Sequence, residues 1–321
     1  MTTLVAGAGG FVGNALVAEL LSAGHRVRAA DIKPFQAWQR VHAGADNRVL
    51  DLRDLDDCRV AVEGVDSVFN LACDMGGIGF IEAHKADCML SVLINTHLLL
   101  AARDARVQRY FFASSACVYS VDKQSRPDLA PLRESDAYPA QPEDGYGWEK
   151  LFSERMCRHF REDFGIATRV ARYHNIYGPY GAYDGGREKA PAAICRKLIQ
   201  AKLSRNYVIE VWGDGKQTRS FTYIDDCIHG TLAVMTSDVE APINLGSSKR
   251  VSIDELIDLA EAIAGIEVRR IYNRDAPGGV RGRSSDNALI EKVLGWQPRI
   301  RLEDGLEKTY RWIYDEMVQK P

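Results

Sequence analysis

No excess of either charge marks this sequence: 41 lysines and arginines stand against 44 aspartates and glutamates, a formal net charge of -3 over 321 residues. Such a balance provides no bulk attraction to nucleic acid or to anionic membranes, so any phosphate site has to be local. An apolar run approaching the roughly 20 residues of a membrane-spanning helix is also missing. We therefore expect neither nucleic acid nor a membrane among the partners of this protein.

Clustered cysteines are missing as well. The seven cysteines are odd in number and scattered, which matches neither a disulfide framework nor the ligand spacing of a metal site. The first strand pattern begins at Leu4, without a basic region or a cleavage site before it. These absences predict a cytoplasmic protein in a reducing environment, with no bound metal.

Short apolar strands and helices alternate through the first half of the chain. Phe11–Leu21, Leu90–Ala105 and Tyr146–Phe160 carry apolar residues at helical spacing. The strands expected around these helices are Thr2–Ala6, Arg26–Ala30, Arg48–Leu50, Ser67–Leu71, Tyr110–Ala113 and Thr168–Tyr173. Strands that alternate with helices predict an α/β fold with a Rossmann-type, doubly wound parallel sheet.

A glycine-rich loop lies between the first strand and the first helix. Its glycines have the GxxGxxG spacing, which permits a tight turn and lets a pyrophosphate approach the backbone N–H groups of a helix N-terminus. The loop therefore predicts a dinucleotide site. The candidate cofactor-binding residues of the loop are Gly7, Gly10, Phe11, Val12 and Gly13.

An acidic residue, Asp31, ends the second strand. Its carboxylate can accept hydrogen bonds from an adenosine ribose, and its charge would repel a 2′-phosphate. The expected cofactor is therefore NAD rather than NADP, although Lys33 nearby weakens the preference. Asp51, just after the third strand, is a candidate for the adenine edge, and an ordinary turn aspartate is nearly as good an interpretation.

The regular alternation loosens after His174, where Gly- and Pro-rich turns appear. A strand at Ile243–Leu245 could rejoin the sheet, whereas the later helices would belong to a smaller lobe. We expect residues 1–175 to form the NAD-binding domain, with returning segments near 216–247. Residues 176–215 and 248–321 would form a smaller C-terminal substrate-binding lobe.

Three residues predict alcohol chemistry. Tyr146 and Lys150 lie one helical turn apart on the same face, and Ser115 follows a predicted strand. An ammonium beside a phenol favours the phenolate, so Tyr146 could act as a base near neutral pH. Ser115 could share the substrate hydroxyl. Such a set removes a proton from an alcohol while hydride leaves the same carbon.

Cys117 allows two interpretations. Free cysteines are among the most buried residues, and spacing alone predicts a core residue. A thiolate at this place could instead deprotonate a carbon acid next to a ketone. The loop Gly185–Lys189 has the composition of a solvated loop, and Arg219, Arg281 and Arg283 are candidates for phosphate contacts, with a basic surface turn as the alternative for Arg283.

The motifs resemble the extended short-chain dehydrogenase/reductase family of sugar-nucleotide epimerases and dehydratases. Segments similar to this family extend over nearly the whole chain. Asp74–Phe80, Ser114–Tyr119 and Gly185–Ala193 are typical of the family's 3,5-epimerases, whereas the glycine loop and YxxxK occur throughout the family. The similar segments are Asp74–Phe80, Ser114–Tyr119, Tyr146–Lys150, His174–Pro179, Gly185–Ala193, Trp212–Phe221 and Val280–Asn287.

The resemblance implies a role for each matching position. Tyr146 and Lys150 would run redox chemistry at C4 with the help of Ser115. Cys117 would be the base and Lys189 the acid on the opposite face of the hexose. The residues implied to hold the nucleotide sugar are Gly76, Gly77, Asn175, Lys189, Lys197, Gln217, Arg219 and Arg281.

The same resemblance implies NAD as the cofactor, GDP-mannose as the substrate and a homodimer. Inversion would follow transient oxidation at C4 and would occur at C5, at C3 or at both. The chain departs from the family pattern at Cys73, where alanine is expected.

Other functions remain open. A 4,6-dehydratase of this family carries an Asp-Glu pair where this chain has Ala116-Cys117, so the acid needed to expel a hydroxyl is missing. A simple 4-epimerase would need neither Cys117 nor Lys189. A non-catalytic NAD-binding scaffold or sensor would not need the Ser-Tyr-Lys set.

Overall fold

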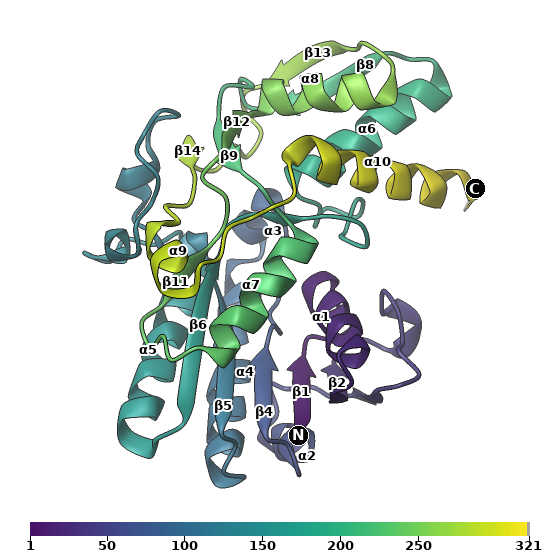
Figure 1. The fold of residues 1–321 in the computed structure, drawn as a ribbon. Helices are drawn as coiled ribbons and strands as arrows, with labels where there is room; N and C mark the ends of the chain where they lie inside the picture. The colour runs from purple at the N-terminus through teal and green to yellow at the C-terminus, as the bar shows by residue number, and fades with distance from the viewer. Residues whose placement is uncertain (320–321) are drawn as a thin grey trace.

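The computed structural model describes residues 1–319, and its main feature is a parallel sheet of seven strands (Figure 1). The strand order is β11-β6-β5-β4-β1-β2-β3, so the chain reverses direction across the sheet between β1 and β4. The strands are β1 (Thr2–Ala6), β2 (Arg26–Asp31), β3 (Asp46–Val49), β4 (Ser67–Asn70), β5 (Arg109–Ser115), β6 (Ala167–Tyr173) and β11 (Ile243–Leu245). The predicted Rossmann-type fold is confirmed.

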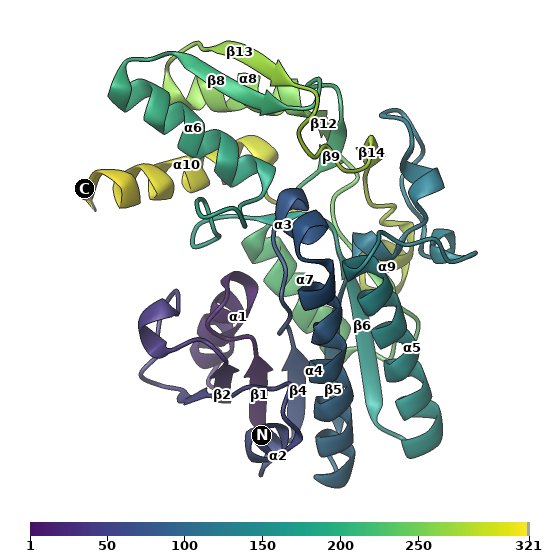
Figure 2. The same cartoon turned by 180° about the vertical axis from the view of Figure 1, so that it is seen from behind.

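Helices cover both faces of the sheet because its strands are apolar on both faces. Val5 and Phe111 belong to the core that includes α1 (Phe11–Ser22) and α7 (Ile224–Thr236). Leu4 and Tyr110, their neighbours in the strands, belong to a second core under the helices on the other face. Those helices are α2 (Leu55–Val62), α4 (Lys85–Asp104) and α5 (Tyr146–Phe164) (Figure 2).

Most predicted elements are present, with shifted ends. The third strand begins two residues earlier than expected, because β3 pairs with β2 from Asp46 opposite Arg28 to Val49 opposite Asp31. The fifth strand continues to Ser115, which pairs with Tyr173 of β6. The short helices α3 (Ile78–Ala83) and α9 (Ala288–Leu294) are not predicted by the sequence pattern.

The rest of the chain forms a smaller lobe above the carboxyl ends of the strands (Figure 1). Its helices pack on one another beside two small sheets, one of two strands and one of three. Between these elements the chain returns to the main sheet, since β11 pairs with β6 and α9 packs against β11. The elements of the lobe are α6 (Ala190–Ser204), β8 (Val208–Trp212), β9 (Thr218–Ser220), β12 (Arg250–Ser252), α8 (Ile253–Ala264), β13 (Arg269–Asn273), β14 (Gly282–Arg283) and α10 (Leu302–Gln319).

Helix α4 differs from the expectation of no long apolar segment. Among residues 1–319 it is the one helix long and apolar enough, by length and composition, to cross a membrane. Its charged residues lie near its ends, which leaves an uncharged middle. The helix packs against α2 and α5, and helices of a protein core pass the same test.

Gly13 is required where α1 meets the glycine loop. A Cβ at Gly13 would lie 2.1 Å from the carbonyl oxygen of Gly7. We expect Gly13→Ala to lower the free energy of unfolding by about 1–3 kcal/mol, because the clash displaces backbone. Gly44→Ala is the matched control, since its Cβ would meet Leu21 at an ordinary 3.6 Å. Urea unfolding of both variants checks this, and equal midpoints would contradict it.

Candidate active site

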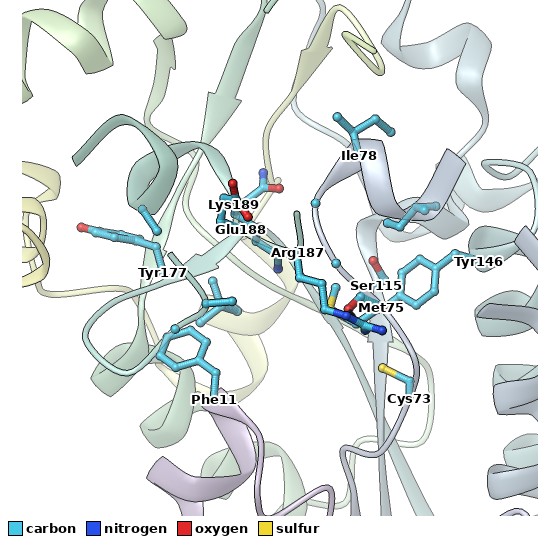
Figure 3. A pocket seen from close by; sticks show the side chains of 18 of the residues that line it. Phe11, Cys73, Met75, Ile78, Ser115, Tyr146, Tyr177, Arg187, Glu188 and Lys189 are labelled. Carbon is cyan, nitrogen blue, oxygen red and sulfur yellow. Dashed lines mark hydrogen bonds between the residues drawn. The ribbon is translucent and has the colours of Figure 1, made fainter. Parts of the chain in front are cut away.

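A cavity of about 970 Å³ opens where the two lobes meet, above the carboxyl ends of β1, β4 and β5. Open α/β sheets bind ligands at this place, where the strand order reverses. Ser115, Tyr146 and Cys73 lie on the wall formed by β5, α5 and the segment after β4, and Lys189 and Phe11 lie across the cavity from them (Figure 3). The cavity therefore brings together both halves of the predicted site.

The glycine loop forms one end of the cavity. All five residues predicted from the loop, Gly7, Gly10, Phe11, Val12 and Gly13, line it. Gly7 has φ +83°, a left-handed conformation, and α1 begins after Gly10 without a side-chain cap. The N–H groups of the first turn of α1 thus remain available to an anion, which fits the pyrophosphate of a dinucleotide.

Asp31 ends β2 beside this loop and lines the cavity. One carboxylate oxygen accepts a hydrogen bond from the Gly9 N–H at 3.0 Å, and the other accepts one from the Lys33 N–H. These bonds hold the carboxylate where it could accept hydrogen bonds from an adenosine ribose. Asp51 also lines the cavity, but Arg53 binds both of its oxygens, and this pairing lowers the pKa of Asp51.

The glycine loop, the uncapped helix start and Asp31 together fit NAD. Gly7, Gly10, Phe11, Val12 and Gly13 would hold its pyrophosphate, Asp31 its adenosine ribose, and Tyr146 would lie beside its nicotinamide half. Lys150, predicted to bind the cofactor as well, is buried and does not line the cavity. The adenine edge stays a prediction for Asp51, whose carboxylate is engaged by Arg53.

Tyr146 and Ser115 face each other within hydrogen-bond reach at the mouth of β5. The first turn of α5 can approach this loop because of Gly147, where a Cβ would lie 2.3 Å from the carbonyl oxygen of Cys117. Burial raises the pKa of Tyr146 well above its ordinary value, and interactions with Cys73 and Cys117 add to this effect. Lys150 Nζ lies 5.5 Å from the centre of the Tyr146 ring, where its charge favours the phenolate against this burial, and the role of Tyr146 as a base stays a prediction.

Lys150 lies beneath Tyr146, with only 2% of its surface exposed. Its Nζ is 3.5 Å from a carboxylate oxygen of Glu149 and 4.7 Å from the ring centre of Phe112. Burial would lower the pKa of Lys150, but Cys73 and Glu149 outweigh burial and raise it. Lys150 therefore stays cationic under the phenol.

Cys117 is both buried and part of the cavity wall. Its side chain is 6% exposed, as a core residue would be, yet it lines the cavity together with Tyr146 and Lys189. The thiol accepts a hydrogen bond from Arg283 Nη1 at 3.4 Å. Burial and the nearby Glu143 carboxylate raise the pKa of Cys117 to about 11, against the opposing effect of Arg283.

Lys189 approaches from the opposite lobe at the start of α6. Burial lowers the pKa of Lys189, and the charge of Cys117 tends to raise it. The two groups are therefore close enough to influence each other's ionisation. The loop before Lys189 is tied to the loop after β4. Gly77 N–H donates to the carbonyl of Arg187 at 3.0 Å, and Arg187 donates to Asp74 at 2.6 Å.

Six of the other predicted substrate residues line the cavity, namely Gly76, Gly77, Asn175, Lys197, Gln217 and Arg219. Gln217 has a buried Oε1 without a hydrogen-bond partner, which leaves an acceptor for a ligand. Burial lowers the pKa of Arg219 to about 9, and the neighbouring Arg283 adds to this effect. Arg281 does not line the cavity, because both its terminal nitrogens bind Asp214 at 3.0 Å.

Two polar residues beside Cys117 and Tyr146 carry no site prediction from the sequence, Glu143 and Cys73, and Arg283, a candidate phosphate contact, donates to the Cys117 thiol instead. Arg283 takes the place expected for Arg281, and the spacing of two arginines around Gly282 does not distinguish them. Glu143 carried no signal, because an acidic residue in a Pro-rich loop is ordinarily solvated. Cys73 stood out only as a departure from the family pattern.

Known proteins with similar sequences identify the family of this chain. The model of the NAD dependent epimerase/dehydratase family matches residues 3–246, most of the chain. The chain belongs to this family. It is 47% identical to GDP-mannose 3,5-epimerase 1 of Oryza sativa subsp. japonica over 98% of the chain and 82% of the relative. It is 45% identical to GDP-mannose 3,5-epimerase of Arabidopsis thaliana over 98% and 83%.

Solved structures of epimerases have the same fold. UDP-glucuronic acid 4-epimerase from Bacillus cereus, in complex with UDP-glucuronic acid and NAD, has a TM-score of 0.83 at 25% identity, covering 98% of this chain and 100% of that one. UDP-glucose 4-epimerase from Thermotoga maritima has a TM-score of 0.89 at 22% identity, covering 99% and 100%. Family membership and NAD as cofactor are thereby confirmed, as is the class of NAD-dependent sugar-nucleotide epimerase. The roles of single residues stay predictions.

Asp31 generates a test of cofactor choice in this family member. We expect Asp31→Ala to narrow the ratio of NADP to NAD dissociation constants about tenfold or more, because a charged hydrogen bond contributes about 1.5–3 kcal/mol. Asp51→Ala is the comparison, since a rim residue paired with Arg53 should affect both cofactors alike. Fluorescence titration with both cofactors measures the ratio, and an unchanged ratio in Asp31→Ala refutes the assignment.

Proposed function

We propose that this protein is a GDP-mannose 3,5-epimerase. The observation that carries the proposal is the meeting of Cys117 and Lys189, from opposite lobes, at the cavity that also holds Tyr146 and Ser115. A thiol and an amine on opposite sides of a hexose are the base and acid that inversion at a carbon acid requires. The relatives from rice and Arabidopsis, at 45–47% identity, support the same substrate.

The reaction begins and ends at C4. NAD⁺, held by the glycine loop and Asp31, would accept a hydride from C4 and give it back, so no external oxidant would be consumed. Tyr146 takes the proton of the C4 hydroxyl, with Ser115 hydrogen-bonded to the same oxygen. The cationic Lys150 under the ring favours the phenolate when the proton has to leave.

The resulting 4-ketone acidifies the C–H bonds at C3 and C5. Cys117 removes one of these protons as a thiolate, and Lys189 delivers a proton to the other face. Burial lowers the pKa of Lys189 toward the range in which an amine gives up its proton readily. Tyr146 then returns its proton to the C4 oxygen as the ketone is reduced.

The diphosphate of the nucleotide would lie against the smaller lobe. Lys197 and Arg219 bring positive charge to that end of the cavity, and Asn175 adds a polar side chain there. Burial lowers the pKa of both Lys197 and Arg219, so an anionic ligand would stabilise their charged forms. Gln217, with its unpartnered Oε1, is available for the nucleoside.

Hydrogen exchange in D₂O tests this function directly. With GDP-mannose, we expect wild type to incorporate deuterium at C3 or C5, or at both, as measured by NMR. Cys117→Ser should lose this exchange but still reduce NAD⁺, because an alcohol is a far weaker source of anion than a thiol.

Tyr146→Phe should keep NAD and lose turnover by about 10²–10⁴-fold.

The outcomes separate the alternatives. A wild type that inverts C4 without exchange at C3 or C5 is a 4-epimerase, and loss of the C6 hydroxyl identifies a 4,6-dehydratase. Binding of NAD with no turnover on any nucleotide hexose leaves a scaffold or sensor. Exchange by Cys117→Ser at the wild-type rate would return Cys117 to the core.

We also propose that the protein is a homodimer that works in the reducing cytosol. Helices α4 and α5 lie side by side (Figure 2), and both carry exposed large apolar side chains, which are typical of an interface. They are Met89, Leu90, Leu93, Trp148 and Phe152.

All seven cysteines are free, which suits a reducing compartment, and fractionation of the source cells tests that location.

Phe152, 53% exposed on α5, gives the test of the dimer. Phe152→Glu should weaken self-association at least about tenfold, because two like charges would be buried at a two-fold interface. Leu203→Glu on α6, at 51% exposure, is the matched control and should leave the mass unchanged. Sedimentation velocity measures both, and a wild type that sediments as a monomer refutes the proposal.

A further inference from the structure

The thiol of Cys117 lies against a pair of opposite charges. Arg283 donates from Nη1 to the Cys117 sulfur at 3.4 Å, and its Nη2 is 3.5 Å from an oxygen of Glu143. The third nitrogen of Arg283, Nε, donates to Gln124 at 2.5 Å. One guanidinium therefore bridges a thiol and a carboxylate inside the cavity wall.

Glu143 is held beside Cys117 by the backbone. Its N–H donates to the carbonyl of Cys117 at 3.0 Å, so the two residues are joined by their main chains as well as through Arg283. Glu143 Oε2 and Arg283 Nη2 are both buried, and neither makes a hydrogen bond. Charges placed this way in a dry wall act strongly on a third group, because little solvent screens them.

Other polar groups also face Cys117. They are Ser115, whose hydroxyl accepts from the Cys117 N–H at 3.2 Å, Tyr146 on α5, Lys189 at the start of α6, and Arg219 on β9. The cations would favour a thiolate, and Glu143 is the acidic group that acts on the thiol directly. Burial and Glu143 together outweigh Arg283, and the pKa of Cys117 stands at about 11. The thiol is thus protonated at neutral pH in the resting protein.

We propose that Glu143 and Arg283 are a positioning pair that controls when Cys117 becomes charged: Glu143 keeps the thiol protonated, and Arg283 is the cation prepared for the thiolate. The use of this control in catalysis rests on the proposed function of Cys117 as the base. The control of ionisation itself does not, since it follows from the contacts of the thiol.

Alkylation of Cys117 by iodoacetamide tests the pair in NAD-loaded protein without substrate. The thiolate is the reacting form, so the rate at a pH below the pKa reports the thiolate fraction. A charge within about 4–6 Å moves a pKa by about one unit or more. At a given pH, Cys117 should therefore be alkylated about tenfold faster in Glu143→Gln than in wild type, and about tenfold more slowly in Arg283→Met.

Cys73 serves as the internal reference, because it lines the same cavity. Peptide mass spectrometry measures the alkylation of both cysteines in one sample. A variant that merely opens the cavity would raise the alkylation rates of both Cys117 and Cys73. Arg283→Lys keeps the charge and should stay within about threefold of wild type, whereas a purely packing role would make it resemble Arg283→Met. Glu240→Gln, an exposed carboxylate paired with Arg161, is the control for loss of one negative charge.

Unchanged Cys117 rates in both Glu143→Gln and Arg283→Met would overturn the inference, as would equal acceleration of Cys117 and Cys73. Opposite changes confined to Cys117 support it. If these changes occur but Cys117→Ser still exchanges deuterium at C3 and C5, the pair governs a thiol that is not the base. In that case the proposed function of Cys117 fails while the inference stands.

Discussion

A buried ion pair between Arg172 and Glu154 holds together the cavity wall that carries Ser115, Cys117 and Tyr146. Arg172, on β6, donates to both oxygens of Glu154, on α5, at 2.9 and 2.7 Å, and Ser114 at the end of β5 donates to the same carboxylate at 2.6 Å. Breaking a buried pair of this kind costs about 3–5 kcal/mol, since one charge stays behind unpaired. Tyr146 and Lys150 precede Glu154 on the same helix, and Ser115 and Cys117 follow Ser114, so the pair sets the distance between phenol and thiol.

The same arginine reaches the edge of the sheet. Arg172 Nη1 donates to the carbonyl of Glu134 at 2.8 Å and to the hydroxyl of Tyr119 at 3.3 Å. Tyr119 donates to Asn244 of β11, whose N–H in turn binds the carboxylate of Glu134 at 3.0 Å. A buried hydrogen-bond network of this extent makes the end of the sheet rigid beside the cavity.

The sequence predicted the sheet well because its strands are apolar on both faces and its helices are amphipathic. It also identified the glycine loop, Asp31 and the Tyr146–Lys150 pair, where local spacing reflects local geometry. It did not distinguish Arg281 from Arg283, because that choice depends on strand pairing: β14 aligns Arg283 with Arg219 of β9. Nor did it predict the burial of Tyr146, which raises the pKa of the phenol and depends on distant segments.

The path of the chain between the lobes has a consequence for protein engineering. After α6, β8 and β9 the chain returns to the sheet for α7 and β11, enters the small lobe again from β12 to β14, returns for α9, and ends in the lobe with α10. No continuous stretch encodes the small lobe, so it cannot be exchanged as a cassette between relatives, and a protease cut at one connection leaves the halves joined by the others. New substrate preferences in this scaffold have to come from changes within loops and single side chains.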